Sequence, residues 1–457
     1  MTGFANLAAM HRATAERLGP RVALRLKRYG LYQDVSWDVY RGRADAVAAA
    51  LIALGIGKGD RVGILAENRA EWPVVDMGIL SAGAVDVPLH APLTPPQVLY
   101  QLEHSGARGL FVSGLVQLEK IEAIRDELTS LEFIVSFDRI DSGVFQGLLT
   151  LDGLLTRGRR DLPRDGGDIH RREASLTHDD LATIIYKSGT TGRPKGVMLT
   201  HGNLVSNAEA TAGCAESSPD DVLLSWLPYS HIYARTCDLY VTMLAGATLA
   251  LAESADTLLV NLAEIQPTDF TSVPRFYEKV WSAVEGLPLA DRSTRLRRIF
   301  GPNVRRLSSG GAPLPRHVAE GFIEAGLPLY EGYGQTESSP VVSFNRVGAA
   351  KVGTVGPAVP GVEVRIADDG EILTRGPHVM KGYWDEPEAT RQTIVDGWLH
   401  TGDVGHLDDE GFLTITDRKK DLIITSLGKN IAPAEIEKLL VADPYIDQAV
   451  LYGDRRP

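Results

Sequence analysis

Residues 186–196 read Tyr-Lys-Ser-Gly-Thr-Thr-Gly-Arg-Pro-Lys-Gly and directly follow the apolar, β-branched run Leu181–Ile185. The run predicts a buried strand. Small residues after a strand let several backbone N–H groups converge on an anion, while hydroxyls and a lysine add donors and positive charge. The stretch therefore predicts a loop that holds a polyphosphate. Its expected phosphate-binding residues are Ser188, Gly189, Thr190, Thr191, Gly192 and Lys195.

The spacing within this loop separates it from the Walker class. A Walker loop has the pattern G-x-x-x-x-G-K-[ST] and opens directly into a helix. Here Gly189 and Gly192 precede a Pro-Lys-Gly sequence at residues 194–196. The loop therefore points away from kinases and other Walker-type NTPases, and toward adenylation.

Four more segments accompany the loop along the chain. They read Ser-Gly-Gly-Ala-Pro-Leu at 309–314, Glu-Gly-Tyr-Gly-Gln-Thr-Glu at 331–337, Trp-Leu-His-Thr-Gly-Asp at 398–403 and Asp-Arg-Lys-Lys-Asp at 417–421. Together with residues 186–196 they resemble the signatures of the acyl-adenylate-forming (AMP-binding) superfamily, which includes acyl-CoA synthetases, luciferases and nonribosomal adenylation domains. Five signatures in the family's order are far more specific than one glycine-rich loop.

The resemblance implies a catalytic set of Thr336, Glu337, His231 and Lys195. Thr336 would bind phosphate through its hydroxyl, and Glu337 would bind Mg²⁺, a hard ion that usually takes one or two protein carboxylates. A Thr-Glu pair by itself is more often a helix start, and its attachment to residues 332–334 favours the functional interpretation. His231 resembles the family histidine beside the acyl carboxylate, with a plain core histidine as the alternative.

The resemblance also implies contacts to the nucleoside. Tyr333 would stack on adenine, and Asp403 would accept hydrogen bonds from both ribose hydroxyls, because one carboxylate can take two donors. The alternative for Asp403 is local turn chemistry. The other expected contacts to ATP or CoA are Gly311, Ala312, Gly334, Arg418 and Gly428.

Lys187 departs from the family, in which threonine is usual at this position. In a strand, successive side chains point to opposite faces, so Lys187 points away from the face of Tyr186. We predict that Lys187 is exposed to solvent rather than placed on a phosphate.

Other segments indicate the branch of the family. Residues 271–279, 417–423 and 428–433 are similar to segments of long-chain fatty acyl-CoA synthetases. Long-chain members often carry a helical insertion where this chain has a short connection from Lys279 to Ser309, so medium-chain and aryl acids remain alternatives. An amino-acid substrate is less favoured, because Asp221 and Asp238 flank the segment 227–233 rather than lie within it.

The chain alternates strand-like and Ala-rich helical segments. Runs at 61–65 and 109–112 read as strands, and residues 46–57 as a core helix. This alternation predicts an α/β fold with parallel sheets. We expect a large domain over 1–416 with two doubly wound, mostly parallel sheets, and a small antiparallel β-barrel over about 351–416. Residues 156–172, with one proline and two adjacent glycines, read as a surface connector.

The end of the chain predicts a hinge and part of a small α+β domain. The hinge would be residues 417–420, with Lys420 at the family's hinge position, and the partial domain would be residues 421–457. Within this region we expect a hairpin between 412–416 and 422–425, then a helix that begins at Pro433. The family's adenylation lysine lies in a late Pro-Lys-x-x-x-Gly-Lys motif that Lys429 and Lys438 do not match, so we expect slow adenylation by this chain.

Composition narrows the function classes. The chain has 457 residues, a net charge of −12 and two cysteines. The acidic balance argues against a nucleic-acid or anionic-membrane surface. Cys214 and Cys237 lack metal or redox spacing and suggest a reduced, cytoplasmic setting with buried thiols. No apolar run approaches the roughly 18 residues of a membrane span.

The expected activity is an ATP-dependent, Mg²⁺-requiring carboxylate–CoA ligase that forms a fatty acyl-AMP and then the CoA thioester. The alternatives are an acyl-AMP ligase that delivers to a carrier protein, and an inactive nucleotide-binding module. The expected partners are a small carboxylic acid, ATP and CoA, with a homodimer as a further possibility.

Overall fold

The computed structural model describes residues 3–140, 147–187 and 192–421, and beyond these residues 423–424, 430–431, 433, 436–437, 440, 446, 449–451 and 453. The predicted phosphate-binding residues 188–191 and Gly428 lie outside the described residues. Most of the helix predicted from Pro433 falls outside them as well.

The first large sheet has eight strands in the order β18-β9-β8-β4-β3-β5-β6-β7. Six of its strands form a parallel block, and β9 and β18 continue it as antiparallel strands at one edge. The bounds are β3 (Arg61–Leu65), β4 (Val85–Leu89), β5 (Ala107–Val112), β6 (Phe133–Ser136), β7 (Leu148–Thr150), β8 (Leu181–Lys187), β9 (Lys195–Thr200) and β18 (Gly382–Tyr383).

The second large sheet also has eight strands, in the order β15-β14-β13-β12-β10-β11-β1-β2. Its six inner strands are parallel, and its two edge strands are antiparallel. The bounds are β1 (Val22–Arg28), β2 (Leu31–Ser36), β10 (Val222–Ser225), β11 (Thr248–Leu251), β12 (Asp269–Ser272), β13 (Arg306–Ser309), β14 (Leu329–Gly334) and β15 (Val341–Phe344).

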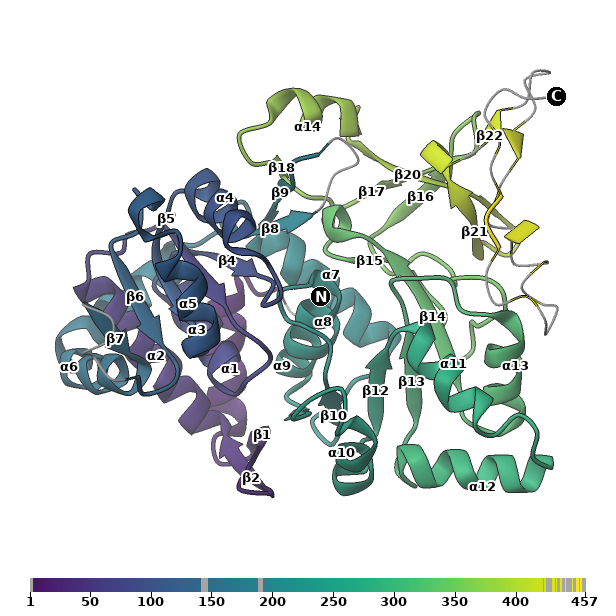
Figure 1. Cartoon of the computed structure of the whole chain (residues 1–457), viewed down its shortest axis with the longest axis horizontal. Helices are drawn as coiled ribbons and strands as arrows, with labels where there is room; N and C mark the ends of the chain where they lie inside the picture. Colours follow the sequence, from purple (N-terminus) through teal and green to yellow (C-terminus); the bar gives the residue numbers. More distant parts are fainter. Residues whose placement is uncertain are drawn as a thin grey trace.

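Three buried cores hold helices against these sheets (Figure 1). The largest joins strands of both sheets to α1 (Leu7–Leu18), α2 (Trp37–Ala53), α3 (Glu71–Ser81), α7 (His201–Cys214) and α9 (Val241–Ala245). A second packs α10 (Leu258–Ile265), α11 (Pro274–Ser282), α12 (Leu289–Phe300) and α13 (Arg316–Glu324) on the second sheet. A third packs α4 (Pro95–Ser105) and α5 (Leu115–Glu122) on the first sheet. The predicted α/β class with two mostly parallel sheets is confirmed.

A buried arginine links the segment between β10 and β11 of the second sheet to the first sheet. Arg235 begins the π-helical segment Arg235–Tyr240, and its side chain is fully buried. It pairs with Asp76 of α3 and Asp86 of β4, and it donates to the Thr183 hydroxyl of β8 over 2.8 Å. A buried charge is tolerated only when its partners satisfy it, so this network holds the segment after residue 231 against the first sheet.

The predicted connector at 156–172 is wrong. These residues belong to α6 (Leu151–Ser175), which packs on α2. Gly158 lies at the crossing, where a Cβ would come within 1.8 Å of the Ala46 carbonyl oxygen. The close helix contact explains this glycine. The proline and the two adjacent glycines that suggested a connector lie within the helix, because packing overrides local propensity.

The small antiparallel unit predicted for 351–416 is a five-stranded sheet of β16 (Glu363–Ile366), β17 (Glu371–Arg375), β19 (Ile394–Val395), β20 (Trp398–Leu407) and β21 (Leu413–Arg418). The predicted hairpin between 412–416 and 422–425 is wrong. β21 pairs with β20, and β22 (Ile423–Ile424) pairs with β23 (Asn430–Ile431). The turn that precedes β21 connects it to β20. In this turn Gly411 takes φ +82°, and its N–H donates to the Asp408 carbonyl. No helix among the described residues is long and apolar enough to cross a membrane.

Candidate active site

The candidate site forms where β8, β14 and β20 come together. Glu337 lies in the 3-10 turn Thr336–Ser338, which begins two residues after the last residue of β14. Its buried carboxylate receives the ammonium of Lys187 at 2.8 and 3.0 Å and the hydroxyl of Tyr383, from β18, at 2.9 Å. Three segments distant in sequence therefore meet at one carboxylate.

These contacts correct the prediction for Lys187. Its side chain retains 33% exposure and is ion-paired, not free in solvent. The strand alternation itself holds, because Tyr186 contacts His104 of α4 at 2.8 Å while Lys187 contacts Glu337. The sequence predicted which face of the strand Lys187 occupies, but not that Glu337 lies against that face.

Lys195 stands opposite Lys187 in the β8–β9 pair, so the two lysines bracket the predicted phosphate loop. The Lys195 ammonium lies 5.0 Å from the centre of the Tyr383 ring and 3.9 Å from the Glu386 carboxylate. Gly192, the last glycine of the loop, is exposed with φ +113°, a region that favours glycine.

Asp403 of β20 is buried and holds two partners. The Tyr333 hydroxyl donates to one carboxylate oxygen over 2.6 Å, and the Arg418 Nε lies 2.9 Å from the other. Burial raises the pKa of Asp403, although the Tyr333 hydrogen bond and the Arg418 charge oppose the rise. The structure thus brings together three predicted nucleotide contacts. Each carboxylate oxygen has a further acceptor position for a ligand hydroxyl.

Gln335 lies between the Lys187–Glu337 pair and strand β20, a role that we did not predict although the residue lies inside a recognised motif. Its amide oxygen accepts from the Lys187 ammonium over 3.2 Å, and its amide nitrogen donates to the Thr401 carbonyl over 3.4 Å. The Asp403 N–H donates in turn to the Thr401 hydroxyl over 3.1 Å, so Glu337 and Asp403 belong to one polar network that runs through Thr401.

An apolar cavity of about 950 Å³, open mouth included, adjoins this network. Its rim includes Gly311, Tyr333, Gly334 and Gln335, whereas Ala312 is exposed and outside the lining. Gly334 permits a tight backbone approach, because a Cβ would come within 1.7 Å of the Pro340 carbonyl oxygen. The nucleotide motifs thus border the cavity directly.

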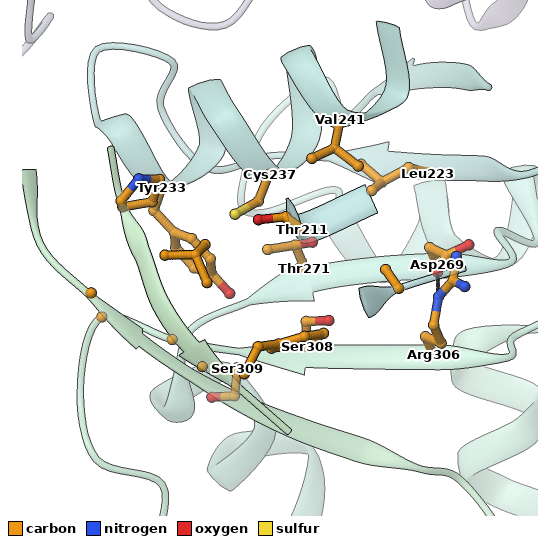
Figure 2. A pocket seen from close by; sticks show the side chains of 18 of the residues that line it. Thr211, Leu223, Tyr233, Cys237, Val241, Asp269, Thr271, Arg306, Ser308 and Ser309 are labelled. Carbon is orange, nitrogen blue, oxygen red and sulfur yellow. Dashed lines mark hydrogen bonds and ion pairs between the residues drawn. The ribbon is translucent and has the colours of Figure 1, made fainter. Parts of the chain in front are cut away.

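Figure 2 shows the cavity walls. They come from α7, β10, β12, β13 and the segment around Arg235–Tyr240, and their side chains are mostly small and uncharged. The sequence analysis did not predict this wall, because no local motif connects its residues. The residues that line the cavity include Thr211, Ala215, Leu223, Tyr233, Cys237, Val241, Thr271 and Ser308.

Charged residues close the far end of the cavity. Arg306 pairs with Asp269, as Figure 2 shows, and its second partner Asp221 lies 3.4 Å away. Arg305 also pairs with Asp221. Asp221 is thus neutralised by arginines and is not a free carboxylate for a ligand.

His231 stands at the opposite, open end. It precedes the short helix α8 (Ile232–Ala234), and its Nδ1 accepts from the Tyr233 backbone N–H over 3.3 Å. Although the residue is exposed, the cleft desolvates its ring, and this effect, with the charges of His90 and Lys187, lowers its pKa. A lowered pKa keeps the ring neutral near pH 7.

Comparisons with known proteins agree with this geometry. The profile described as "AMP-binding enzyme" matches residues 11–384. A long-chain-fatty-acid–CoA ligase, FadD15, of Mycobacterium bovis is 36% identical over 94% of this chain and 76% of its own length. A long-chain-fatty-acid–CoA ligase of Escherichia coli O157:H7 is 34% identical over 90% of this chain and 77% of its own.

Solved structures give the same result. The anthranilate CoA ligase AuaEII in complex with anthranoyl-AMP has a TM-score of 0.84 and 25% identity, covering 98% of this chain and 84% of its own. A Mycobacterium tuberculosis fatty acyl CoA synthetase has a TM-score of 0.77 and 28% identity, covering 98% and 85%. The chain therefore belongs to the acyl-adenylate-forming family of AMP-binding enzymes.

Proposed function

We propose that the chain is an ATP-dependent carboxylate–CoA ligase that converts a long- or medium-chain fatty acid to its acyl-AMP and then to the CoA thioester. The observation that carries this proposal is the direct junction between a polar network, from Glu337 to Asp403, and an apolar cavity. Such a junction suits a reaction between a nucleotide phosphate and an acid with an apolar tail.

Activation needs a charged site because attack on a carboxylate must overcome its negative charge. Adenylation supplies a good leaving group, and the protein must align the acid oxygen with the α-phosphorus. Thr336 and the loop that ends at Lys195 would hold the phosphates. Neutral His231, at the cavity mouth, would orient the acid.

The magnesium ion would sit at Glu337. Among the described residues no group of three or more His, Cys, Asp or Glu side chains could hold a metal, so the remaining ligands would be phosphate oxygens and water. That donor set matches the habit of Mg²⁺, which would supply charge neutralisation for the triphosphate. Tyr383 would keep the carboxylate in place, since burial and the Glu337 charge raise its pKa and preserve its hydroxyl proton.

The nucleoside side would use Asp403 for the ribose and Tyr333 for the adenine. Arg418 lies at the end of β21, where we place the hinge at residues 417–420. Rotation there would remove Arg418 from Asp403 and admit CoA, as expected for a two-step ligase.

The nature of the cavity supports a fatty acid over an amino acid. Its inner wall offers apolar and small side chains, and Asp221 is already paired with two arginines. Asp238 accepts a hydrogen bond from Ser225 over 2.7 Å and is not part of the lining. The names of the relatives, long-chain-fatty-acid–CoA ligases, favour the same substrate class.

The test is AMP formation from ATP with a panel of acids from hexanoate to octadecanoate, with benzoate and leucine as comparison acids. A fatty acyl–CoA ligase should release AMP only with a fatty acid and CoA together. Release that needs a carrier protein instead would support the acyl-AMP ligase. An acyl-AMP analogue that binds no more tightly than ATP would indicate an inactive module, because a catalytic site binds the intermediate far more tightly.

A further inference from the structure

Lys187 has an unusual place in the site. It ends β8 and immediately precedes the predicted phosphate loop. Its ammonium has three acceptors within 3.2 Å: both oxygens of Glu337 and the amide oxygen of Gln335. The carboxylate that we assign to magnesium therefore already carries a cation from the protein itself.

Two lysines lie at the two ends of the loop, each beside a carboxylate. Lys187 and Lys195 are directly opposite in an antiparallel pair, where like charges destabilise each other. Tyr383 joins them, since its hydroxyl donates to Glu337 while its ring lies under Lys195. Lys195 lies 3.9 Å from Glu386 while Lys187 pairs with Glu337, so an ammonium that leaves its carboxylate is free for another anion at this end of β8.

Glu337 is held more firmly than Lys187. The Glu337 carboxylate receives the Tyr383 hydroxyl, and its backbone carbonyl accepts from the Met380 N–H over 2.9 Å. Lys187, by contrast, remains one-third exposed on a flexible stem with three donor hydrogens. When the pair separates, the lysine is the partner that moves.

We propose that Lys187 is a phosphate-binding residue that shares Glu337 with the metal. In the empty site its ammonium neutralises Glu337. When the nucleotide binds, the ammonium leaves that carboxylate to Mg²⁺ and donates to phosphate oxygens. The proposal rests on the proposed function, because it requires ATP in this cleft. Its consequence is that ATP binding by this chain depends less on Mg²⁺ than binding by a variant without the lysine.

The experiment measures the dissociation constant of ATP by calorimetry with excess Mg²⁺ and again with EDTA. The quantity of interest is the dissociation constant with EDTA divided by the dissociation constant with Mg²⁺, called the ratio below. In Lys187→Thr, metal-free binding should weaken because a charge-assisted hydrogen bond is lost, and Mg²⁺ should meet no competitor at Glu337. Both effects raise the ratio, and we expect an increase of about tenfold or more.

Two further variants make the result decisive. Lys187→Met keeps an apolar stem without the charge and should raise the ratio equally. Lys351→Thr removes a lysine that pairs with Asp408 and Glu410 elsewhere, and should leave the ratio unchanged.

An equal ratio in the parent and in both Lys187 variants would overturn the proposal, as would an effect of threonine that methionine does not reproduce. Failure of the parent to bind ATP under either condition would instead overturn the proposed function.

Discussion

The proposed nucleotide side of the site and the apolar cavity are neighbours that are built in different ways. The proposed nucleotide side is built from short motifs whose charged residues pair with one another, Lys187 with Glu337 and Arg418 with Asp403. The cavity is built from small residues of α7, β10, β12 and β13, and it shares only its rim with the motifs. The charged side chains define the first region, whereas the size and shape of the empty space define the cavity.

The difference teaches how each region tolerates change. A charged network loses function when one partner is removed, because the other partner remains buried without compensation. A cavity wall contributes through volume, so its substitutions should alter which acid fits rather than whether the reaction proceeds. Variants can test this distinction one region at a time.

The largest effect is expected on the nucleotide side. Glu337→Gln keeps the size of the side chain but removes the charge for the metal, and pyrophosphate–ATP exchange should fall by roughly 100- to 1,000-fold. The matched control is Glu363→Gln, which changes an exposed carboxylate paired with Arg375. If exchange by Glu337→Gln stayed within tenfold of the parent, the metal assignment would be wrong.

Asp403→Asn should have the next largest effect. Because hydrogen bonds to a charged acceptor contribute about 1.5–3 kcal/mol, AMP affinity measured by calorimetry should drop by roughly 10- to 100-fold. Asp408→Asn, which affects an ion pair with Lys351 at a turn of the same sheet, serves as the control. Equal AMP affinity in the two variants would show that Asp403 does not bind the nucleotide.

Cys237→Phe tests the cavity. The added ring would occupy the space of several methylene groups, each contributing about 0.8 kcal/mol, so the preference for hexadecanoate over octanoate in kcat/KM should fall by about tenfold or more. Cys237→Ala should change it little, and the affinity for ATP should be the same in both variants. A uniform loss for both acids would mean that Cys237 is not in the acyl path.

The smallest predicted effect concerns the framework that both regions share. Burial lowers the pKa of His11 to about 3, and lowers the pKa values of His201 and His378 to about 4. Because the unfolded chain protonates these histidines near pH 6.5 and the native chain does not, stability is lost as pH falls below that value.

His11→Phe should cancel one of these contributions. Between pH 7.5 and pH 6 its unfolding free energy should decline by about 0.8 kcal/mol less than that of the parent, measured by chemical denaturation. Parallel losses in the two proteins would show that the pKa of His11 is the same in the native and unfolded chains.

Local patterns predicted much of this molecule. The strand expected at 61–65 is β3, with the same bounds, because an apolar run that ends at turn residues behaves alike in most surroundings. The motif residues Tyr333 and Asp403 contact each other, and Glu337 belongs to the same polar network; each carries a chemical identity visible in its own segment. The partner of β21 was misjudged, because a strand can pair with the strand before it or with the strand after it, and β21 pairs with β20, the strand before it.

From its residues alone, this chain is recognisable as an adenylate-forming enzyme, since glycines, hydroxyls, lysines and carboxylates at set spacings have few other uses. Folding in three dimensions decided the partner of Lys187, the continuity of α6 past its glycines and the walls of the apolar cavity. Each of these depends on contacts between segments far apart in the chain, and such contacts leave no periodic or local trace because their free energy arises only on packing.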